Sequence, residues 1–302
     1  MTTPLLFPLP GNGGMADRIA SKHDMEVGQL EVRHFPDGET YLRFDNDIQD
    51  RAVILLCTLD RPDEKVMPLM FAAATARDLG ARRIGLICPY LAYMRQDGRF
   101  RAGEGITSAY FAKFLSAQID WLVTVDPHLH RLKALNQIYS VPAAALHAMP
   151  LIAGWIRETV RQPLIIGPDR EREQWVAAVA RQATAPYVIL EKTRRGDRDV
   201  EVSVPEIAKW RDRQPVLVDD IISTARTMIE TVRHLKRAEV KPAICVAVHG
   251  IFADRAYEDL VASGAAQVVT TNTIPHATNG IDVSGLLAQG VKTLALAGSD
   301  SE

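Results

Sequence analysis

The chain has few of the features that mark secreted, membrane-spanning or nucleic-acid-binding proteins. Its 302 residues include only three cysteines, Cys57, Cys88 and Cys245. Each lies in an apolar run, so we expect buried free thiols rather than a disulfide framework or a paired-cysteine zinc site. No apolar run approaches the ~20 residues that cross a bilayer, and the N-terminus lacks the basic start and apolar core of a secretory signal. The formal net charge of −2 gives no basic surplus, so we expect a cytoplasmic protein with no nucleic-acid or membrane partner.

Apolar segments of two kinds alternate along the chain. Hydrophobic residues make up 47% of it, enough for a core, and the length fits one large domain or two of about 150 residues. We expect strands at 30–35, 53–58, 83–89, 121–125, 164–166, 187–190, 216–218 and 243–249, and helices at 66–79, 108–118, 151–160, 173–182 and 227–238. This alternation is typical of an α/β fold in which helices flank a mainly parallel sheet.

One pattern of strand, loop, helix and strand occurs twice, over 53–88 and again over 216–249, with nearly equal spacing. We infer two similar α/β domains, 1–145 and 146–302, although two ordinary strand–helix–strand units would show the same pattern by convergence. Only the second copy carries two adjacent carboxylates after its first strand.

The most informative motif follows the strand expected at 216–218. Asp219 and Asp220 stand where this strand ends, and a hydroxyl-rich loop over 223–227 leads into the next helix. Backbone N–H groups at a helix start bind phosphate, and the hydroxyls add donors. The two carboxylates would meet ribose hydroxyls. The run resembles the sugar-phosphate loop of the type I phosphoribosyltransferase-like fold, which predicts a phosphorylated sugar as ligand and leaves the reaction open.

Two earlier segments offer groups that would bind a nucleotide. The turn after the first expected strand exposes Phe35 as a stacking face and Asp37 and Glu39 as hydrogen-bond acceptors, although Pro-Asp-Gly is also a common plain turn. The segment after the third expected strand should lie at the carboxyl edge of the sheet, where α/β folds bind ligands. There Arg95 and Arg99 would clamp phosphates, unless the segment is a solvated basic loop.

Three further segments carry groups suited to metal binding and charge stabilisation. His128, in Asp-Pro-His, and Asp169, in Gly-Pro-Asp, each follow an expected strand. They would ligate a divalent cation between phosphate oxygens, although a histidine at a strand end is commonly structural. Lys192 and Arg194 lie in a charged, glycine-containing loop, which is either a solvated charge run or a mobile lid that closes over a transferring group.

Taken together, the order and spacing of these motifs resemble the ribose-phosphate pyrophosphokinase family, from Leu5 to about Leu287. The resemblance implies two tandem type I phosphoribosyltransferase-like domains, each a mainly parallel sheet flanked by helices. Domain 1–145 would contribute to the nucleotide site and domain 146–302 would carry the ribose 5-phosphate loop. The implied reaction transfers the diphosphoryl group of ATP to the C1 hydroxyl of ribose 5-phosphate, giving phosphoribosyl pyrophosphate and AMP, with Mg²⁺ as cofactor. The resemblance also implies a homo-oligomer whose nucleotide site is shared between subunits.

The resemblance further implies a role for each matching residue. Lys192 and Arg194 would stabilise the transition state, and His128 and Asp169 would bind Mg²⁺. The residues expected to bind ATP are Phe35, Asp37, Glu39, Arg95, Gln96 and, less directly, Arg99. The residues expected to bind ribose 5-phosphate are Asp219, Asp220, Ser223, Thr224, Ala225, Arg226 and Thr227.

The chain departs from the family's usual pattern at three places. The commonest sugar-phosphate loop reads Asp-Thr-Ala-Gly-Thr, and here Ser223 and Arg226 replace its Asp and Gly. Arg226 either strengthens phosphate binding or points to solvent. Gly98 interrupts the usual Arg-Gln-Asp-Arg run, and a charged segment at 170–172 replaces the usual small residues. These changes bear on nucleotide specificity, phosphate activation and allosteric control more than on the reaction.

Two other functions share some of these features. A phosphoribosyltransferase, which consumes phosphoribosyl pyrophosphate with a nucleobase, has the same acid-pair loop but needs neither the N-terminal copy nor an ATP site. A non-catalytic regulatory subunit of the same fold would be expected to have lost Lys192, Arg194, His128 or the acid pair, and all of these are present.

Overall fold

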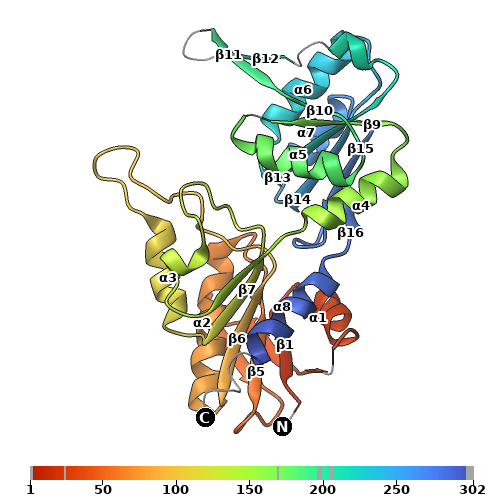
Figure 1. Cartoon of the computed structure of the whole chain (residues 1–302). Coiled ribbons are helices and arrows are strands. Elements are labelled where there is room, and N and C mark those ends of the chain that lie inside the picture. The colour runs from red at the N-terminus through yellow and green to blue at the C-terminus, as the bar shows by residue number, and fades with distance from the viewer. Residues whose placement is uncertain (1–2, 24, 169, 196–198, 204–206, 297–302) are drawn as a thin grey trace. The chain divides into compact units, whose positions relative to one another are not determined.

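The central strands of this protein are short apolar runs buried on both faces, as expected for parallel sheets covered by helices. The computed structural model describes residues 3–23, 25–168, 170–195, 199–203 and 207–296. Unit 1 contains the described residues up to His147, together with Thr273–Pro275 and those from Val283 onward. Unit 2 contains Ala148–Asn272 and His276–Asp282 (Figure 1).

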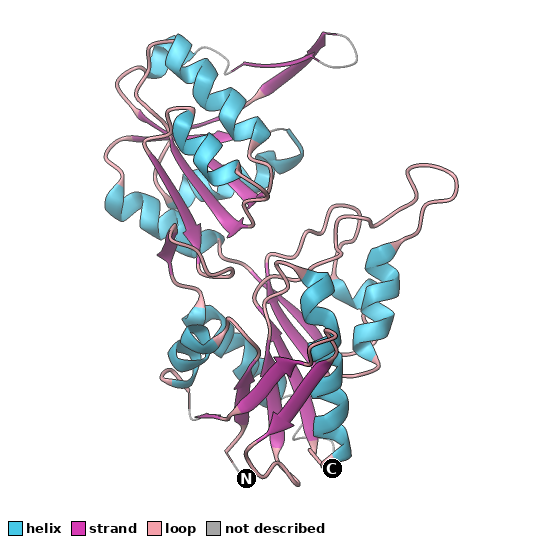
Figure 2. Cartoon of the chain, turned by 180° about the vertical axis from the view of Figure 1, so that it is seen from behind, coloured by secondary structure: helices cyan, strands magenta, loops and turns pink. Residues whose placement is uncertain are grey.

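Unit 1 is built on a parallel sheet. In the described part of the chain its strand order is β2-β1-β5-β6-β7-β8, with bounds β1 Leu5–Pro8, β2 Glu26–Val27, β5 Ala52–Leu56, β6 Arg83–Cys88, β7 Trp121–Val125 and β8 Ala143–Leu146. Helices α2 (Pro62–Asp78) and α3 (Thr107–Ser116) lie on one side of the sheet, and α1 (Gly13–Ala20) and α8 (Ser284–Leu296) on the other (Figure 1, Figure 2). A hairpin of β3 (Leu30–His34) and β4 (Thr40–Phe44) and a 3₁₀ turn, η1 (Leu135–Gln137), complete the unit.

Unit 2 is built on a second parallel sheet, in the order β10-β9-β13-β14-β15-β16 among its described residues. The strands are β9 Pro163–Gly167, β10 Tyr187–Ile189, β13 Gln214–Ile222, β14 Ile244–Gly250, β15 Gln267–Thr271 and β16 Asn279–Ile281. Its helices are α4 Met149–Thr159, α5 Glu173–Gln182, α6 Arg226–Arg237 and α7 Ala256–Ala262, with 3₁₀ turns η2 Arg170–Arg172 and η3 Ile207–Trp210. A separate antiparallel hairpin pairs β11 (Glu191–Arg195) with β12 (Asp199–Ser203).

The two sheets have the same topology. When the sheet strands of each unit are counted along the chain, the second lies at one edge, the first follows it, and the third to sixth follow in order. The predicted α/β fold with two similar parallel-sheet units is therefore confirmed. The third strand of each sheet, β5 in unit 1 and β13 in unit 2, occupies the same place, with a helix following it in both.

The C-terminal helix α8 belongs to unit 1, whereas the sequence had led us to expect one continuous second domain over 146–302. Gly290 of α8 lies so close to the first sheet that a Cβ there would stand 2.7 Å from Leu146 Cδ1 and 3.0 Å from Val123 Cγ1. The segment leading to α8 is also tied to unit 1, because Thr58 Oγ1 donates a hydrogen bond to the Thr273 carbonyl, at 2.6 Å. Apolar spacing shows that a helix has a buried face but not which sheet that face covers.

Most expected elements are present with shifted ends, and one shift affects the site. We expected a strand to end at Val218 and the two carboxylates to follow it. Instead β13 continues to Ile222, pairing Asp219 with Ala247 and Ile222 with Gly250 of β14. The acids therefore lie within a strand, where the backbone is held by the ladder on one side. Several elements, among them β1, α1, β8, β15, β16, α7 and α8, were not predicted, because they are short or lack clear periodicity.

In the part of the chain that the structure describes, no helix combines the length and apolarity needed to cross a bilayer.

We predict that Gly85→Ala destabilises unit 1 by about 1–3 kcal/mol, because the new Cβ overpacks a full core. Gly85 lies in β6, and a Cβ there would stand 1.9 Å from Cζ2 of Trp121, whose side chain is buried. Gly14→Ala in α1 of the same unit is the matched control, since nothing lies within 4 Å of its Cβ position. Urea unfolding followed by circular dichroism measures both, and equal midpoints would contradict the packing.

Candidate active site

Two carboxylates lie side by side near the carboxyl end of β13. Asp220 is buried, with 8% of its surface exposed, and Asp219 is half-buried. The Asp220 N–H donates a hydrogen bond to Asp219 Oδ1, at 2.9 Å. Burial and the neighbouring Asp220 charge raise the pKa of Asp219 well above its usual value. Two uncompensated charges on this pair are therefore unfavourable. A shared proton, a hydrogen bond from a bound hydroxyl or a nearby cation would each stabilise the pair.

A cation lies directly against this pair. Arg172, at the end of η2, donates from Nη2 to Asp220 Oδ2, at 2.5 Å, and the two side chains are 29% and 11% exposed. The guanidinium charge opposes the rise in the pKa of Asp219. Sequence analysis did not select Arg172 as a site residue. The signal available was the charged run at 170–172, but nothing in it indicated a partner on β13.

The loop after β13 is shaped by a left-handed residue. Ala225 has φ +56°, which a small residue tolerates better than a branched one, and α6 begins at the next residue. Segment 251–253 holds the loop: the N–H groups of Ile251 and Phe252 both donate to the Ile222 carbonyl, and that of Ala253 donates to the Ser223 carbonyl. The loop encloses a hollow of about 130 Å³. Asp219 lines it together with the loop residues Ser223, Thr224, Ala225, Arg226 and Thr227.

Arg226 lies at the rim of this hollow. It is the first residue of α6 and is exposed, so its backbone is helical and does not need the glycine usual at that position. It also lines a larger groove of about 810 Å³ with Arg233, Lys236 and Arg237 of α6 and residues of α7. Among the described residues Arg226 makes no ion pair, and its guanidinium can therefore serve an anion in the loop.

Two loops of unit 1 meet at the carboxyl ends of β6 and β7, which are neighbours in the sheet. The carboxylate of Asp97, only 3% exposed, accepts a hydrogen bond from the Arg131 N–H at 3.0 Å, and Arg131 Nε lies 3.8 Å from its other oxygen. A Cβ at Gly98 would stand 3.1 Å from Arg131 Nη1. Arg131 therefore lies against Gly98, and it joins the loop that carries Arg95 to the loop that carries His128.

The second of these loops carries two histidines. The rings of His128 and His130 are nearly parallel, 7° apart, with centroids separated by 6.2 Å. Just before them Asp126 accepts from His147 Nδ1, at 2.9 Å, and this hydrogen bond raises the pKa of His147. His128 is half-buried and belongs to an imidazole pair next to a carboxylate.

The β3–β4 turn presents an aromatic stack. Phe35 is 42% exposed and meets Tyr41 edge to face, with ring centroids 6.0 Å apart. The Arg33 guanidinium lies 3.9 Å from the Tyr41 ring centroid and 5.0 Å from that of Phe35. Asp37 Oδ1 accepts the Glu39 N–H, at 3.2 Å, which closes the turn. An exposed ring held in this way offers a face to a planar base.

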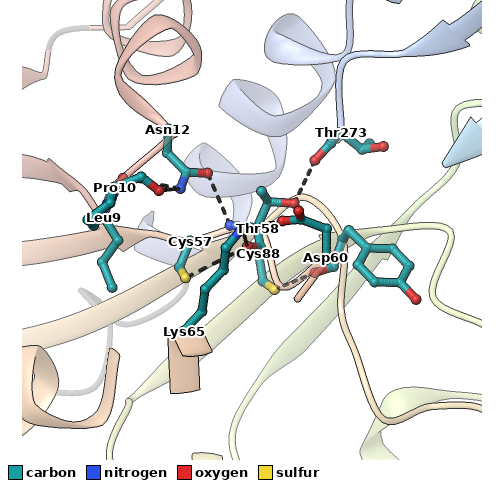
Figure 3. Close-up of polar contacts among 10 residues, drawn as sticks. Leu9, Pro10, Asn12, Cys57, Thr58, Asp60, Lys65, Cys88 and Thr273 are labelled. Atoms are coloured by element: carbon teal, nitrogen blue, oxygen red, sulfur yellow. Dashed lines mark hydrogen bonds and ion pairs between the residues drawn. The ribbon is translucent and has the colours of Figure 1, made fainter. Parts of the chain in front are cut away.

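In unit 1, the strand end equivalent to that of β13 is closed by an internal polar network (Figure 3). Thr58, just after β5, takes part through three groups. Its N–H donates to Asn12 Oδ1 at 3.0 Å, its hydroxyl donates to the Thr273 carbonyl, and its own carbonyl accepts from Lys65 Nζ at 3.1 Å. Lys65 also pairs with Asp60, and burial raises the pKa of the Cys57 thiol to about 12. The N–H, hydroxyl and carbonyl of Thr58 are thus bonded within the unit, whereas the loop after β13 is open.

The remaining expected site residues are Asp169, Lys192 and Arg194. Asp169 lies outside the described residues. Lys192 and Arg194 stand at alternate positions of β11, opposite Val202 and Val200 of β12. Their strand is part of a two-stranded hairpin rather than the charged loop that we expected.

Comparisons with known proteins cover nearly the whole chain. Residues 5–118 match the sequence profile of the N-terminal domain of ribose phosphate pyrophosphokinase, and residues 134–284 match the phosphoribosyl transferase domain. A ribose-phosphate pyrophosphokinase of Sulfurisphaera tokodaii is 34% identical over 88% of this chain and 94% of its own. The enzyme of the same name from Saccharolobus solfataricus is 33% identical over 86% and 90%.

A solved structure matches the chain over both halves. The crystal structure of phosphoribosylpyrophosphate synthetase from Mycobacterium smegmatis matches 98% of this chain and 100% of its own, with a TM-score of 0.85 at 25% identity. The acid pair, the loop that follows it and the duplicated sheet are thus found in a chain whose relatives cover it end to end. The protein belongs to the ribose-phosphate pyrophosphokinase family.

Proposed function

We propose that this protein transfers the β,γ-diphosphoryl group of ATP to the C1 hydroxyl of ribose 5-phosphate, giving phosphoribosyl pyrophosphate and AMP. The observation that carries the proposal is the acid pair of β13 joined to an open hydroxyl-lined loop, in a chain of this family. A diphosphotransferase must hold a sugar phosphate and a nucleotide at once, and the chain has separate groups suited to each.

Unit 2 would bind ribose 5-phosphate. The 5-phosphate would enter the hollow at 223–227, where the N–H groups at the start of α6, the hydroxyls and Arg226 all favour an anion. Asp219 and Asp220 would accept hydrogen bonds from the ribose hydroxyls. Fixing the sugar at both ends brings its C1 hydroxyl to one position, which removes much of the entropic cost of the reaction.

Unit 1 would bind ATP. Phe35 offers its exposed ring to adenine, with Asp37 and Glu39 beside it on the turn. Arg95 and Gln96 lie on the loop that Asp97 anchors to Arg131, and they would bind the nucleotide's polyphosphate. Arg99 donates from Nε to the Glu104 carbonyl, at 3.1 Å, so its backbone contact limits its reach and its role is the smaller one.

Charge spreads over phosphoryl oxygens in the transition state, and cations stabilise it. Lys192 and Arg194 on the β11–β12 hairpin would supply this charge when the hairpin closes on the transferring group. Among the residues that the structure describes we assign no protein base for the C1 hydroxyl, and the acid pair would orient this hydroxyl through hydrogen bonds.

The donor set fits Mg²⁺ held largely by substrate. Mg²⁺ keeps several waters and binds through phosphate oxygens with one or two protein ligands. His128 and Asp169 would be those ligands. When bound, Mg²⁺ would neutralise charge on the phosphate oxygens.

A homo-oligomer would complete the nucleotide site. Phe35 stands on a hairpin that is separate from the main sheet, with its ring exposed. A stacking residue on such a projection can serve a site on a second copy of the chain.

Incubation with ATP, Mg²⁺ and ribose 5-phosphate tests the proposed reaction. We expect phosphoribosyl pyrophosphate and AMP in equal amounts, with no AMP when ribose 5-phosphate is omitted. Product formation only from phosphoribosyl pyrophosphate and a nucleobase would establish a phosphoribosyltransferase instead.

We predict that Lys192→Ala or Arg194→Ala lowers kcat by about 10²–10³, because electrostatic stabilisation by one such group is typically worth ~3–4 kcal/mol. KM for both substrates should change little. Thr193→Ala, between the two on β11, is the matched control and should keep most of the activity. A rise in KM without loss of kcat would argue against the transition-state role.

We predict that Arg226→Ala raises KM for ribose 5-phosphate about tenfold, the effect of losing one charge-assisted hydrogen bond to an anion. Arg233→Ala is the control, since Arg233 lies on the same helix and lines only the outer groove. Steady-state kinetics with ribose 5-phosphate varied measures both. Equal KM values for Arg226→Ala and the unmodified enzyme would show that Arg226 points to solvent.

A shared nucleotide site predicts complementation between two defective variants. Phe35→Ala and Lys192→Ala proteins, unfolded together and refolded, should recover activity at limiting ATP, because mixed oligomers contain one site with both residues intact. Lys192→Ala mixed with Arg194→Ala should not recover, since both residues belong to the same site of each subunit. Failure of the first pair, when mixed oligomers are shown to form, would place Phe35 in its own subunit's site or in none.

A further inference from the structure

The acid pair of β13 has a partner that the reaction as described does not use. Arg172 donates from Nη2 to Asp220 Oδ2, at 2.5 Å, and its side chain is 29% exposed. It comes from η2, which follows β9, and β9 is the strand next to β13 in the sheet. The contact therefore links the turn after one strand to the carboxylate of its neighbour.

The contact between Arg172 and Asp220 relieves the repulsion between the two carboxylates. Asp219 and Asp220 are consecutive, both are largely withdrawn from water, and one accepts the backbone N–H of the other. Two such carboxylates repel, and the cheapest relief is for one to rotate away or take up a proton. A guanidinium fixed on Asp220 compensates one charge and holds that carboxylate in a single orientation, because a charge-assisted hydrogen bond has strict geometry.

The orientation matters because of what the pair would hold. Under the proposed function the ribose hydroxyls donate to these carboxylates, and a donor gains most when its acceptor is already in place. We propose that Arg172 is a positioning residue for ribose 5-phosphate, acting through Asp220 to keep the acid pair ready for the sugar hydroxyls.

Its neighbour provides a matched comparison. Arg170 lies on the same turn, two residues earlier, and is exposed. Among the described residues it makes no ion pair or hydrogen bond, so removing it takes away one positive charge from the turn and leaves the Asp220 contact intact. A difference between the two variants reports the contact rather than the net charge of the loop.

Binding and turnover are measured together on the full-length protein. Arg172→Ala should weaken the binding of ribose 5-phosphate about tenfold or more, both as Kd from titration calorimetry and as KM. KM for ATP should stay within about twofold, and the thermal unfolding midpoint should stay within about two degrees. Arg172→Lys, which keeps the positive charge, should recover part of the affinity. Arg170→Ala should bind ribose 5-phosphate as the unmodified protein does.

Several results would overturn the positioning role. They are unchanged ribose 5-phosphate binding in Arg172→Ala, equal losses for ribose 5-phosphate and ATP, an equal loss in Arg170→Ala, or Arg172→Lys no better than Arg172→Ala. If Arg172→Ala does not fold, Arg172→Gln takes its place under the same criteria. The calorimetric arm needs no turnover, so a protein that binds ribose 5-phosphate but makes no phosphoribosyl pyrophosphate would refute the proposed reaction and still decide the role of Arg172.

Discussion

The site in unit 2 depends on two adjacent carboxylates held near the end of a buried strand. Placing them there costs free energy, because like charges lie close together in a poorly solvated position. The raised pKa of Asp219 and the guanidinium on Asp220 are two responses to that cost. Sugar hydroxyls are a third, since they supply donors without adding charge. The repulsion between the two carboxylates thus makes this strand end well suited to a polyhydroxylated ligand.

The same sheet topology occurs twice in the chain, and the side chains at the equivalent strand end differ between the two units. In unit 1 the strand end closes on itself through Thr58, Asn12 and Lys65, with a buried thiol where unit 2 has an acid. Its neighbouring loops instead carry arginines and histidines, joined by Asp97 and Arg131. One topology therefore supplies a stabilised core in one unit and a binding loop in the other, and the difference lies in a few polar side chains rather than in the fold.

The sequence was a good guide to what is local and a poor guide to what is not. Apolar runs located the central strands, and the acid pair with its hydroxyl-rich loop identified the ligand class, because those residues are consecutive. It could not show that β13 runs on through the acids, since that depends on pairing with β14. Nor could it show that Arg172 reaches Asp220, or that Arg131 lies against Gly98, because each contact joins residues far apart in the chain.

The return of the chain to unit 1 has a consequence during synthesis. Thr273 leaves the ribosome after every strand of unit 2 except β16, and helix α8 leaves it after all of them. Until then one side of the first sheet lacks its final helix, and Thr58 lacks its acceptor. An N-terminal domain normally folds as soon as it emerges. Unit 1 cannot complete its fold at that point, and the apolar surface that α8 covers stays exposed while unit 2 is translated. A premature stop before α8 would leave unit 1 without this helix. Its exposed apolar surface would then make it a target for chaperones or proteases.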